Sequence, residues 1–466
     1  MGEILKFEQV IESYISGDWG NDESSEEASC AVSCIRGADI VPIRNSDFTN
    51  IPTRYISSRS LAAHTLKEGD IVIEKSGGSP TQSTGRVVYI SKELLEAKGD
   101  VVCSNFCVAF RVKAEWNPKY IYYYLCNIYN ADVFFNFEGK TSGLKNLQVE
   151  AAFKAIPIKK IAIEEQASIA NTLSIIESKL AVNRQINDNL EAMAKQLYDY
   201  WFVQFDFPNE EGKPYKSSGG EMVWNDKLKR EIPEGWTCGT LLDIAVYTNG
   251  LACQKFRPIN DDKLPVIKIK EMHDGISPDT EYVKADIPES VKVYDGDVLF
   301  SWSASLEVML WAMGNGGLNQ HIFKVTSKNN YPRSFYFYQL IDYIGNFKKM
   351  AEARKTTMGH ITQDHLKQST IALPPNVHLP NRLEEILNPI FESIITNSQE
   401  MAALTKQRDE LLPLLMNGQV SVNYHLSTRI RMTAVCQNDY QTNIFMCWHI
   451  VFSYFQYLRI RKFVTL

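Results

Sequence analysis

The fold of this chain is decided by residues 164–201, which read EEQASIANTLSIIESKLAVNRQINDNLEAMAKQLYDYW. Apolar and amide side chains recur there in alternating steps of four and three residues, which is the spacing of a coiled-coil seam, and no Gly or Pro interrupts them. Residues 383–415 repeat this pattern, with Pro389 placed early enough to kink a helix without abolishing it. The seam positions include Leu173, Leu180, Asn183, Leu190 and Leu197 in the first stretch, and Leu387, Ile394, Asn397, Leu404 and Leu411 in the second. We therefore predict two long helices, each with a narrow seam that needs a partner helix.

The two predicted helices are copies of one unit. Leu173 and Leu387 are 214 positions apart, and so are Asn183 and Asn397. The copying extends upstream at similar offsets: residues 120–125 match 335–340, residues 110–112 match 323–325, and residues 69–72 match 296–299. The chain is therefore predicted to be a tandem duplication of a globular domain followed by a long helix.

The order of apolar runs, turns and heptads divides the chain into six segments. We predict a first globular domain at residues 1–160, a first long helix at 161–206, a polar linker at 207–231, a second globular domain at 232–376, a second long helix at 377–420 and an aromatic C-terminal extension at 421–466. Short apolar runs at 70–74, 86–90 and 106–110, separated by Gly, Ser and Asp, are typical of strands. The predicted fold class of each globular domain is α+β.

Charge and cysteine usage restrict the classes of function. The net charge of −6 and the pI near 5.9 argue against a chain that coats nucleic acid by bulk charge, although they are compatible with a local basic face. Nine cysteines without a secretion signal predict the reducing cytoplasm. Cys30 and Cys34 are four residues apart, as are Cys103 and Cys107, but no further pairs complete a zinc site. Buried free thiols and no metal are the expectation.

Two polar segments of the first domain are candidate DNA contacts. The loop 75–86 is rich in Ser, Thr and Gly and carries a cation at each end, which suits contact with phosphates or base edges, although an ordinary solvated hairpin loop has the same composition. Residues 138–160 hold five lysines, two glutamates and a Thr-containing turn whose amides can approach a phosphate; a solvated basic surface is the alternative. The candidates in these segments are Lys75, Ser76, Thr81, Gln82, Arg86, Lys140, Thr141, Ser142, Lys145 and Asn146.

The second domain carries equivalent candidates. Residues 301–303 occupy the place of the polar loop, residues 319–321 precede a predicted strand, and residues 347–368 are again net positive with a Thr-rich turn. Asn and Gln side chains can read adenine edges bidentately, and Arg or Lys can read guanine. The candidates in this domain are Trp302, Ser303, Asn319, His321, Arg354, Lys355, Thr356, Thr357 and His360.

We find no complete catalytic motif. Residues 373–376 contain the two prolines of an adenine methyltransferase motif but lack both its leading amide and its trailing aromatic residue. Residues 139–141 resemble half a P-loop, but Phe134 stands where the required Gly would be, so nucleotide binding is not predicted. Two competitors to DNA recognition remain, a stand-alone nuclease and a coiled-coil scaffold that binds only protein.

The order of these segments resembles the DNA-specificity subunit of type I restriction-modification systems. The resemblance covers residues 30–420 and includes Glu164–Ala170 opening a long helix, Gly235 and Trp236 opening a second domain, and Gln407–Gly418 closing a second helix. It implies two tandem α+β target-recognition domains, separated by two long spacer helices that pack as an antiparallel coiled coil with pseudo-twofold symmetry. It also implies a non-catalytic chain that reads a bipartite sequence in double-stranded DNA.

The resemblance further implies the partners. Two modification subunits are expected to supply adenine methylation that depends on S-adenosylmethionine, and restriction subunits are expected to supply cleavage driven by ATP and Mg. No cofactor is expected on this chain itself.

Two more expectations concern the helices and the C-terminus. Asn183 and Asn397 face the predicted seam, where they could pair across the two helices and fix their register; a solvated edge is the alternative. The aromatic run at residues 444–458 has fifteen residues, which is shorter than the about 20 needed to span a bilayer, so no membrane attachment is predicted.

Overall fold

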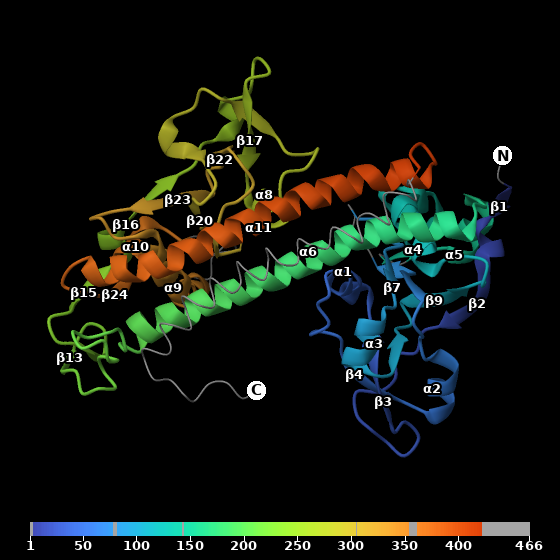
Figure 1. Ribbon diagram of the computed structural model, residues 1–466, viewed down its shortest axis with the longest axis horizontal. Helices are drawn as coiled ribbons and strands as arrows, with labels where there is room; N and C mark the ends of the chain where they lie inside the picture. The colour runs from blue at the N-terminus through green and yellow to red at the C-terminus, as the bar shows by residue number, and fades with distance from the viewer. Residues whose placement is uncertain (1–2, 78–81, 142–143, 304, 354–360, 422–466) are drawn as a thin grey trace. The chain divides into compact units, whose positions relative to one another are not determined.

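The computed structural model describes residues 3–77, 82–141, 144–303, 305–353 and 361–421. Two compact units make up the chain. The first unit comprises residues 1–181 together with 404–434, and the second unit comprises residues 182–403 together with 435–466. The boundary between the units falls within both long helices, so each unit contains one globular domain and part of each helix (Figure 1).

The first unit is built on small sheets. Its strands are β1 (Ile4–Lys6), β2 (Ile11–Ser16), β3 (Cys30–Ile35), β4 (Thr53–Ile56), β5 (Ile71–Glu74), β6 (Ser76–Gly77), β7 (Val87–Tyr89), β8 (Val101–Cys103), β9 (Cys107–Val112), β10 (Glu138–Thr141), β11 (Leu144–Leu147) and β12 (Pro157–Lys159). The central sheet is antiparallel in the order β2-β9-β5-β7. Strand β3 pairs antiparallel with β4 and parallel with β8, β1 pairs with β12, and β10, β11 and β6 form a fourth sheet. The three strands predicted from apolar runs are confirmed as β5, β7 and β9.

The helices of this domain include α1 (Ile40–Arg44), α2 (Ser58–His64), α3 (Lys92–Lys98), α4 (Pro118–Asn130) and α5 (Val149–Ala155). Helix α4 begins at Pro118 because proline needs no helical N–H donor, and the Asn117 side chain accepts a hydrogen bond from the Tyr120 amide at 3.1 Å. The aromatic run of α4 then lies in a buried core whose centre is Phe153, 4.5 Å from Phe7 and 5.5 Å from Phe110 between ring centroids.

The second unit has a similar set of strands and helices. Its strands are β13 (Met222–Asn225), β14 (Arg230–Pro233), β15 (Thr237–Thr240), β16 (Ala245–Asn249), β17 (Lys263–Ile267), β18 (Tyr282–Lys284), β19 (Lys292–Val293), β20 (Val298–Ser301), β21 (Glu307–Leu310), β22 (Gly316–Leu318), β23 (Ile322–Ser327) and β24 (Thr370–Leu373). Its helices include α7 (Leu241–Ile244), α8 (Ile269–Asp274), α9 (Arg333–Ala353) and α10 (Gln363–Lys367). The central sheet has the order β16-β23-β20-β21 and is antiparallel throughout.

Strand topology confirms the predicted duplication. The sheet β2-β9-β5-β7 corresponds strand by strand to β16-β23-β20-β21, and the pairing of β3 with β4 and β8 corresponds to the pairing of β17 with β18 and β22, including the one parallel pair in each. An ion pair is also duplicated. Arg111 binds Asp70 at 2.8 Å in the first unit, and Lys324 binds Asp297 at 2.8 Å in the second.

The long helices are α6 (Ile163–Tyr198), which continues as a π-helical turn over Asp199–Val203, and α11 (His378–Met416). In the second unit they run antiparallel, because Asn183 donates to Glu400 at 2.8 Å while Asn187 accepts from Asn397 at 3.0 Å. In the first unit the start of α6 and the end of α11 share one buried core. The predicted pairing of Asn183 with Asn397 is therefore wrong by one helical turn: in an antiparallel pair of duplicated helices only positions at the pseudo-twofold axis face their duplicates, and Asn183 lies away from that axis.

The seam predicted from heptads is largely buried. Leu173, Leu180, Asn183, Leu387, Ile394 and Asn397 are buried, and Leu190, Leu197, Leu404 and Leu411 are half-buried. Two amides in a mostly apolar seam are costly unless paired, and each is hydrogen-bonded across the helices. The alternative of a solvated edge is thereby excluded for these two residues.

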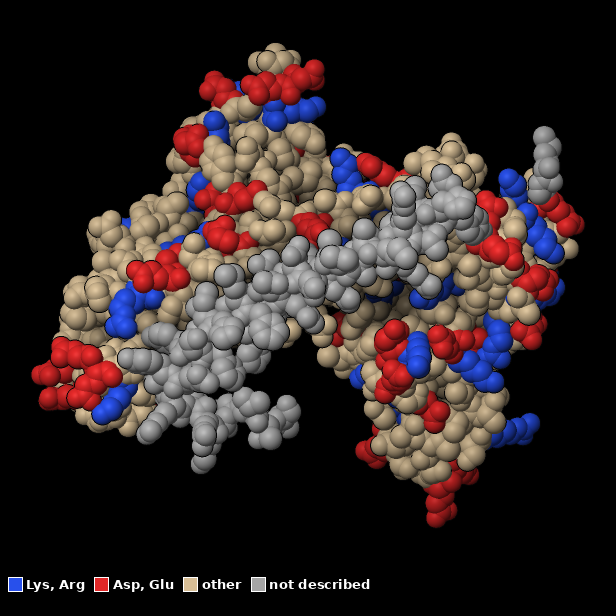
Figure 2. Space-filling model, viewed as in Figure 1, with Lys and Arg blue, Asp and Glu red and all other residues tan. Residues whose placement is uncertain are grey.

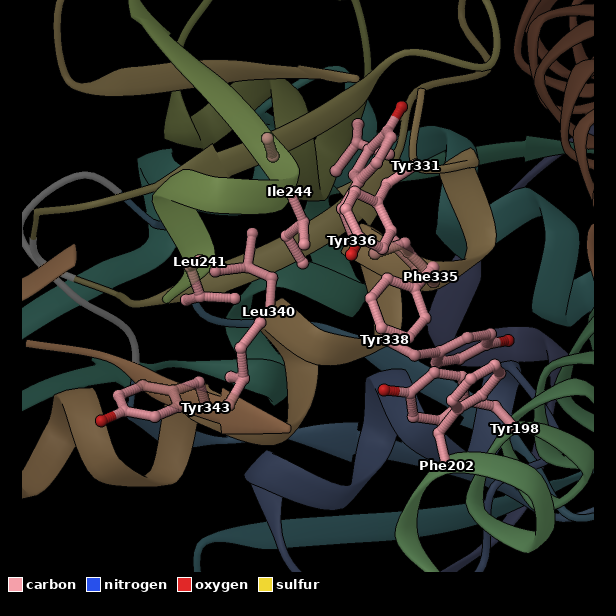
Figure 3. Close-up of a cluster of buried hydrophobic side chains, with 14 of the residues drawn as sticks. Tyr198, Phe202, Leu241, Ile244, Tyr331, Phe335, Tyr336, Tyr338, Leu340 and Tyr343 are labelled. Carbon is pink, nitrogen blue, oxygen red and sulfur yellow. The ribbon is translucent and has the colours of Figure 1, made fainter. Parts of the chain in front are cut away.

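Figure 3 shows how α6 ends inside the core of the second unit, where Tyr198 and Phe202 lie against the aromatic face of α9. The ring centroids of Phe202 and Phe335 are 4.9 Å apart, and those of Tyr198 and Tyr338 are 5.0 Å apart. Leu241 of α7 belongs to the same cluster. The end of the first long helix is therefore a structural part of the second domain.

The segment 207–231, predicted as a polar linker, is folded. Strands β13 and β14 pair as an antiparallel hairpin, and the Phe207 ring stacks on Tyr215 at 4.8 Å and on Trp236 at 5.7 Å. Its composition of Gly, Ser and charged residues did not indicate that Phe207 and Tyr215 pack with Trp236 of the following domain, so composition alone was misleading.

No helix in the described part of the chain is long and apolar enough to cross a membrane. The aromatic run predicted at residues 444–458 lies outside the described residues.

Candidate nucleic-acid interface

The fold brings together the two polar segments that were predicted separately in the first domain. Strand β6, at the start of the loop 75–86, pairs with β11, so that Ser76 is opposite Asn146 and Gly77 is opposite Lys145. The Ser76 hydroxyl also donates a hydrogen bond to the Asn146 side-chain oxygen. Two of the predicted residues thus form one polar surface on the sheet β10-β11-β6.

Lys145 is engaged inside this surface. Its ammonium lies 3.4 Å from the Glu138 carboxylate, donates to the Gln82 carbonyl at 3.1 Å and lies over the Phe135 ring, and its side chain is only 13% exposed. Glu138 in turn accepts a hydrogen bond from the Thr84 amide at 2.6 Å. These contacts hold the loop 75–86 against the β10–β11 hairpin. Lys145 is therefore withdrawn as a candidate phosphate contact.

Arg86 is also turned inward. Its guanidinium makes two hydrogen bonds to the Glu74 carboxylate, at 2.9 and 2.6 Å, and the two side chains are 15% and 2% exposed. The hydrogen bonds that Arg86 donates to Glu74 raise the pKa of Arg86. Gly77, with φ at +147°, allows this geometry, since a Cβ there would lie 2.7 Å from the Glu74 Oε1 atom. The predicted DNA contact at Arg86 is replaced by an internal ion pair that supports the loop.

The remaining candidates of the first domain are divided by exposure. Lys75 and Gln82 are exposed, and Ser76 is half-buried. Lys140 and Thr141 lie on β10, where their backbones pair with Lys145 and Leu144. Thr81 and Ser142 lie outside the described residues.

In the second domain, the structure joins Trp302 to His321. Their ring centroids are 5.6 Å apart, and the Trp302 indole donates to the Asn249 side chain at 3.0 Å. The Ile361 amide donates to the Trp302 carbonyl at 3.0 Å. The exposed His321 and the half-buried Trp302 therefore form an aromatic surface beside the end of the basic segment predicted at residues 347–368.

Two other candidates in this domain are buried. Ser303 is 6% exposed and Asn319 is 7% exposed. The Asn319 side chain accepts a hydrogen bond from the His321 amide at 3.3 Å, so it shapes the turn that presents His321. Polarity in the sequence could not distinguish this supporting role from base contact. The candidates outside the described residues are Arg354, Lys355, Thr356, Thr357 and His360.

Sequence reasoning missed a groove in the first unit. This cavity of about 920 Å³ is bordered by Tyr14, Ser16, Lys75, Asn105, Gln148 and Lys154, of which only Lys75 was predicted. Asn105 and Gln148 stand in short turns after β8 and β11, and nothing in their local sequence separates them from other polar turn residues. Only the pairing of β6 with β11 brings them to one place.

On the face shown in Figure 2, the coloured charges are not gathered in one patch. Basic and acidic side chains are interspersed among the coloured residues of that face. Among the described residues, no group of three or more His, Cys, Asp or Glu side chains is arranged to hold a metal ion. Burial raises the pKa of the Cys34 and Cys107 thiols to about 12, as expected for inert thiols in a core.

Solved and curated proteins resemble this chain over most of its length. It is 26% identical over 412 residues to the type I restriction enzyme MjaIX specificity subunit of Methanocaldococcus jannaschii, covering 83% of this chain and 88% of that protein. It is 22% identical over 413 residues to the type I restriction enzyme HindI specificity subunit of Haemophilus influenzae, covering 77% of this chain and 88% of that protein. The crystal structure of a type I restriction-modification S subunit from M. genitalium shares the fold, with a TM-score of 0.53 and 13% identity over 89% of this chain and 96% of that one.

The family model described as the type I restriction modification DNA specificity domain matches this chain twice, at residues 43–192 and 233–405. Each match spans most of one globular domain and part of the long helix that follows it, in agreement with the duplicated topology. Because the two matches cover more than half of the sequence, the chain belongs to the family of type I restriction-modification DNA-specificity subunits.

Proposed function

We propose that this chain recognises a DNA sequence in two parts, with one part read by each duplicated domain, and that it directs adenine methylation and restriction by partner subunits. The observation that carries the proposal is the repeated topology: corresponding loops of the two domains each present polar and aromatic side chains beside the same pair of central strands. A duplicated reading head suits a target in two parts better than a single site.

In this proposal the exposed residues of the two surfaces contact DNA. Lys75, Gln82 and the pair Ser76–Asn146 serve the first domain, and Trp302 and His321 serve the second. Lys140, Thr141 and Ser142, together with residues 354–360, remain candidates for phosphate contacts on the strength of the sequence. The loops that carry these residues are held in place by side chains that are buried or paired within the domain, namely Lys145, Arg86, Ser303 and Asn319.

The proposed partners are two modification subunits and the restriction subunits of a type I enzyme. The modification subunits would carry S-adenosylmethionine, and the restriction subunits would carry ATP and Mg. Support comes from the names of the relatives, which are specificity subunits of type I restriction enzymes.

The proposal is tested by co-expressing the chain with the modification subunit encoded beside it and mapping methylated adenines on host DNA. We expect an asymmetric motif of two parts with a constant gap. Replacement of residues 232–376 by the matching domain of a relative should change only one part of the motif. A complex that forms but methylates without sequence preference would overturn the proposal and favour a coiled-coil scaffold without DNA specificity.

A further inference from the structure

The groove of the first unit is suited to reading bases. It lies among the end of β2, the turn after β8 and the turn after β11, and it borders Lys75 at the start of the polar loop. All of these residues belong to the same unit. The groove therefore continues the polar surface of β6 and β11 described above.

Two side-chain amides in the groove have no hydrogen-bond partner. Asn105 and Gln148 are both exposed, and neither amide group makes a hydrogen bond within the described residues. Three other amides of the domain are occupied: Asn117 caps α4, Gln166 accepts from the Asn117 amide, and Asn146 accepts from Ser76. A free carboxamide presents one acceptor and two donors, which match N6 and N7 of adenine in the major groove.

The backbone that carries these amides is held by hydrogen bonds to one residue. The Lys75 amide donates to the Phe106 carbonyl at 2.8 Å, and the Leu147 amide donates to the Lys75 carbonyl at 2.8 Å. Lys75 thus links the turn containing Asn105 to the turn containing Gln148. Gly17 fits tightly against the first turn, since a Cβ there would lie 2.0 Å from the Ser104 carbonyl oxygen. The two amides are therefore presented from ordered backbone, as base readout requires.

The charges around the groove set its polarity. Lys75 and Lys154 border it and make no ion pair within the described residues, whereas Glu150 borders it beside Tyr14. Glu8 and Glu12 line a smaller adjoining cavity with Glu150 and Lys154. DNA phosphates are repelled from this acidic side, so they are expected to approach along Lys75, next to the free amides.

Phe106 indicates which base pair is read. It follows Asn105 directly, and its side chain is 57% exposed although it is a large apolar group on a polar surface. A phenyl ring can contact the thymine methyl group in the major groove, while an amide pairs with the adenine of the same base pair.

We propose that Asn105 and Gln148 read adenine in the half of the target recognised by the first domain, with Phe106 against a thymine methyl group. This inference rests on the proposed function and adds specificity-determining residues to it. The chemistry is hydrogen bonding and apolar contact, without any covalent step.

The test uses the complex of this chain with its modification subunits. Duplexes carry the mapped target, with 7-deazaadenine replacing each adenine of the first half in turn, which removes the N7 acceptor. Wild type should lose roughly tenfold in affinity at one or two of these adenines. The Asn105→Ala and Gln148→Ala variants should each bind the unmodified duplex with an affinity lower by a similar factor. For each variant, 7-deazaadenine at the adenine that the lost side chain reads should cause no further loss of affinity.

Two further variants keep the test informative if an alanine variant folds poorly. Gln148→Glu retains size and polarity, and it should shift the preference at its position from adenine towards cytosine, whose N4 amino group donates to a carboxylate. Asn50→Ala removes another exposed amide of the same domain, outside the groove, and should leave affinity unchanged.

The outcomes separate the two proposals. A wild-type complex without a two-part motif would contradict the proposed function itself. Two results would overturn the assignment of Asn105 and Gln148 and leave the proposed function standing. One is a two-part motif whose first half contains only G·C pairs. The other is a loss of affinity on 7-deazaadenine substitution that is the same in wild type and in both alanine variants.

Discussion

The two globular domains share an interior and differ at the loops that carry the candidate interface. Both have the same strand order and the same ion pair beneath the central sheet, Asp70 with Arg111 and Asp297 with Lys324. At the end of the next strand they diverge. The first domain has Glu74, which binds Arg86, and the second has Ser301, which donates to the Ser305 carbonyl.

This difference teaches where a duplicated domain is free to change. Side chains at these strand ends bind the loops that follow, so each copy can adopt a different support for a different loop. The interior cannot diverge so freely, because its strands must keep pairing and packing. Divergence at Glu74 and Ser301 is therefore consistent with the proposal that the two domains read different parts of the target.

The long helices differ in the same way between the units. In the first unit, Tyr123 of α4 donates to Glu177 of α6 at 2.6 Å. The duplicated position on α11 holds the buried Phe391, and the neighbouring Glu392 is 59% exposed and binds Arg333 at 3.2 Å. The seam of the second unit instead contains the polar layer of Asn183, Asn187 and Asn397.

The largest expected effect concerns the loop supports. Glu74→Ala leaves Arg86 buried without its partner, so the local stability of the first domain should fall by about 3–5 kcal/mol. Ser301→Ala, the matching change in the second domain, removes two neutral hydrogen bonds, one donated to the Ser305 carbonyl and one accepted from the Glu307 amide, and should cost about 1–2 kcal/mol. Native-state hydrogen exchange of the β5 and β20 amides measures each domain separately. Equal losses in the two domains would show that the supports are equivalent.

The polar layer of the helices should have the second largest effect. Asn187→Leu removes the acceptor of Asn397 and leaves its amide unpaired in the seam, which should cost about 1–3 kcal/mol. The double variant Asn187→Leu with Asn397→Leu removes both polar groups and should recover most of that loss, while the helices lose a device that fixes their register. Thermal unfolding of the three proteins tests this. A double variant that is no more stable than the single one would contradict the pairing.

A smaller effect is expected from the duplicated ion pair. Arg111 donates two hydrogen bonds to Asp70, both at 2.8 Å, so Arg111→Lys should cost about 1 kcal/mol by removing one of them. The reverse change, Lys324→Arg, should bring no gain, because the Lys324 ammonium also donates to the Lys292 carbonyl at 2.8 Å. Hydrogen exchange of β9 and β23 measures both. A stabilising Lys324→Arg would show that the second pair is merely suboptimal.

The smallest effect is a dependence on pH that Glu177 should give to the first unit. Burial raises the pKa of Glu177 above 4.5, despite the opposing hydrogen bond from Tyr123. The protonated carboxyl is therefore favoured by folding: its contribution to stability is complete below pH 4.5 and is lost as the pH rises through the raised pKa.

The measurement is the difference in the free energy of unfolding between wild type and Glu177→Gln, followed from below pH 4.5 upward through the raised pKa of Glu177. The neutral amide of the variant does not titrate, so the stability of Glu177→Gln should increase relative to that of wild type as the pH rises. Glu392→Gln, at an exposed carboxylate on the other long helix, is the control and should show no such trend. Parallel pH profiles for wild type and Glu177→Gln would contradict a raised pKa.

Much of the architecture was predictable from the chain because it depends on local or repeated patterns. The heptads at 164–201 and 383–415 require helices with one apolar stripe, and apolar runs such as residues 70–74 can only be buried strands. The nearly constant offset between matching residues of the two halves indicates the duplication without any knowledge of strand topology. Each of these signals is periodic or repeated, so it survives without tertiary information.

Partners across the structure were not predictable in the same way. The heptad register placed Asn183 in the seam, but only the antiparallel arrangement decides that it meets Glu400 while Asn187 meets Asn397. Likewise, Arg86 and Lys145 have the composition of a DNA-contacting loop, yet each faces a carboxylate in its own domain. A cation at a polar turn has the same sequence signature whether it faces solvent or an internal acid.

The sequence by itself determined two α+β domains, two long helices and their duplication, since these follow from spacing along the chain. Only the tertiary structure decided which polar residues are exposed for recognition and which support the loops from below. It also brought Asn105 and Gln148, which are 43 residues apart, to one groove through the pairing of β6 with β11. Such a juxtaposition depends on hydrogen bonds between distant strands, and these leave no periodic signal in the sequence.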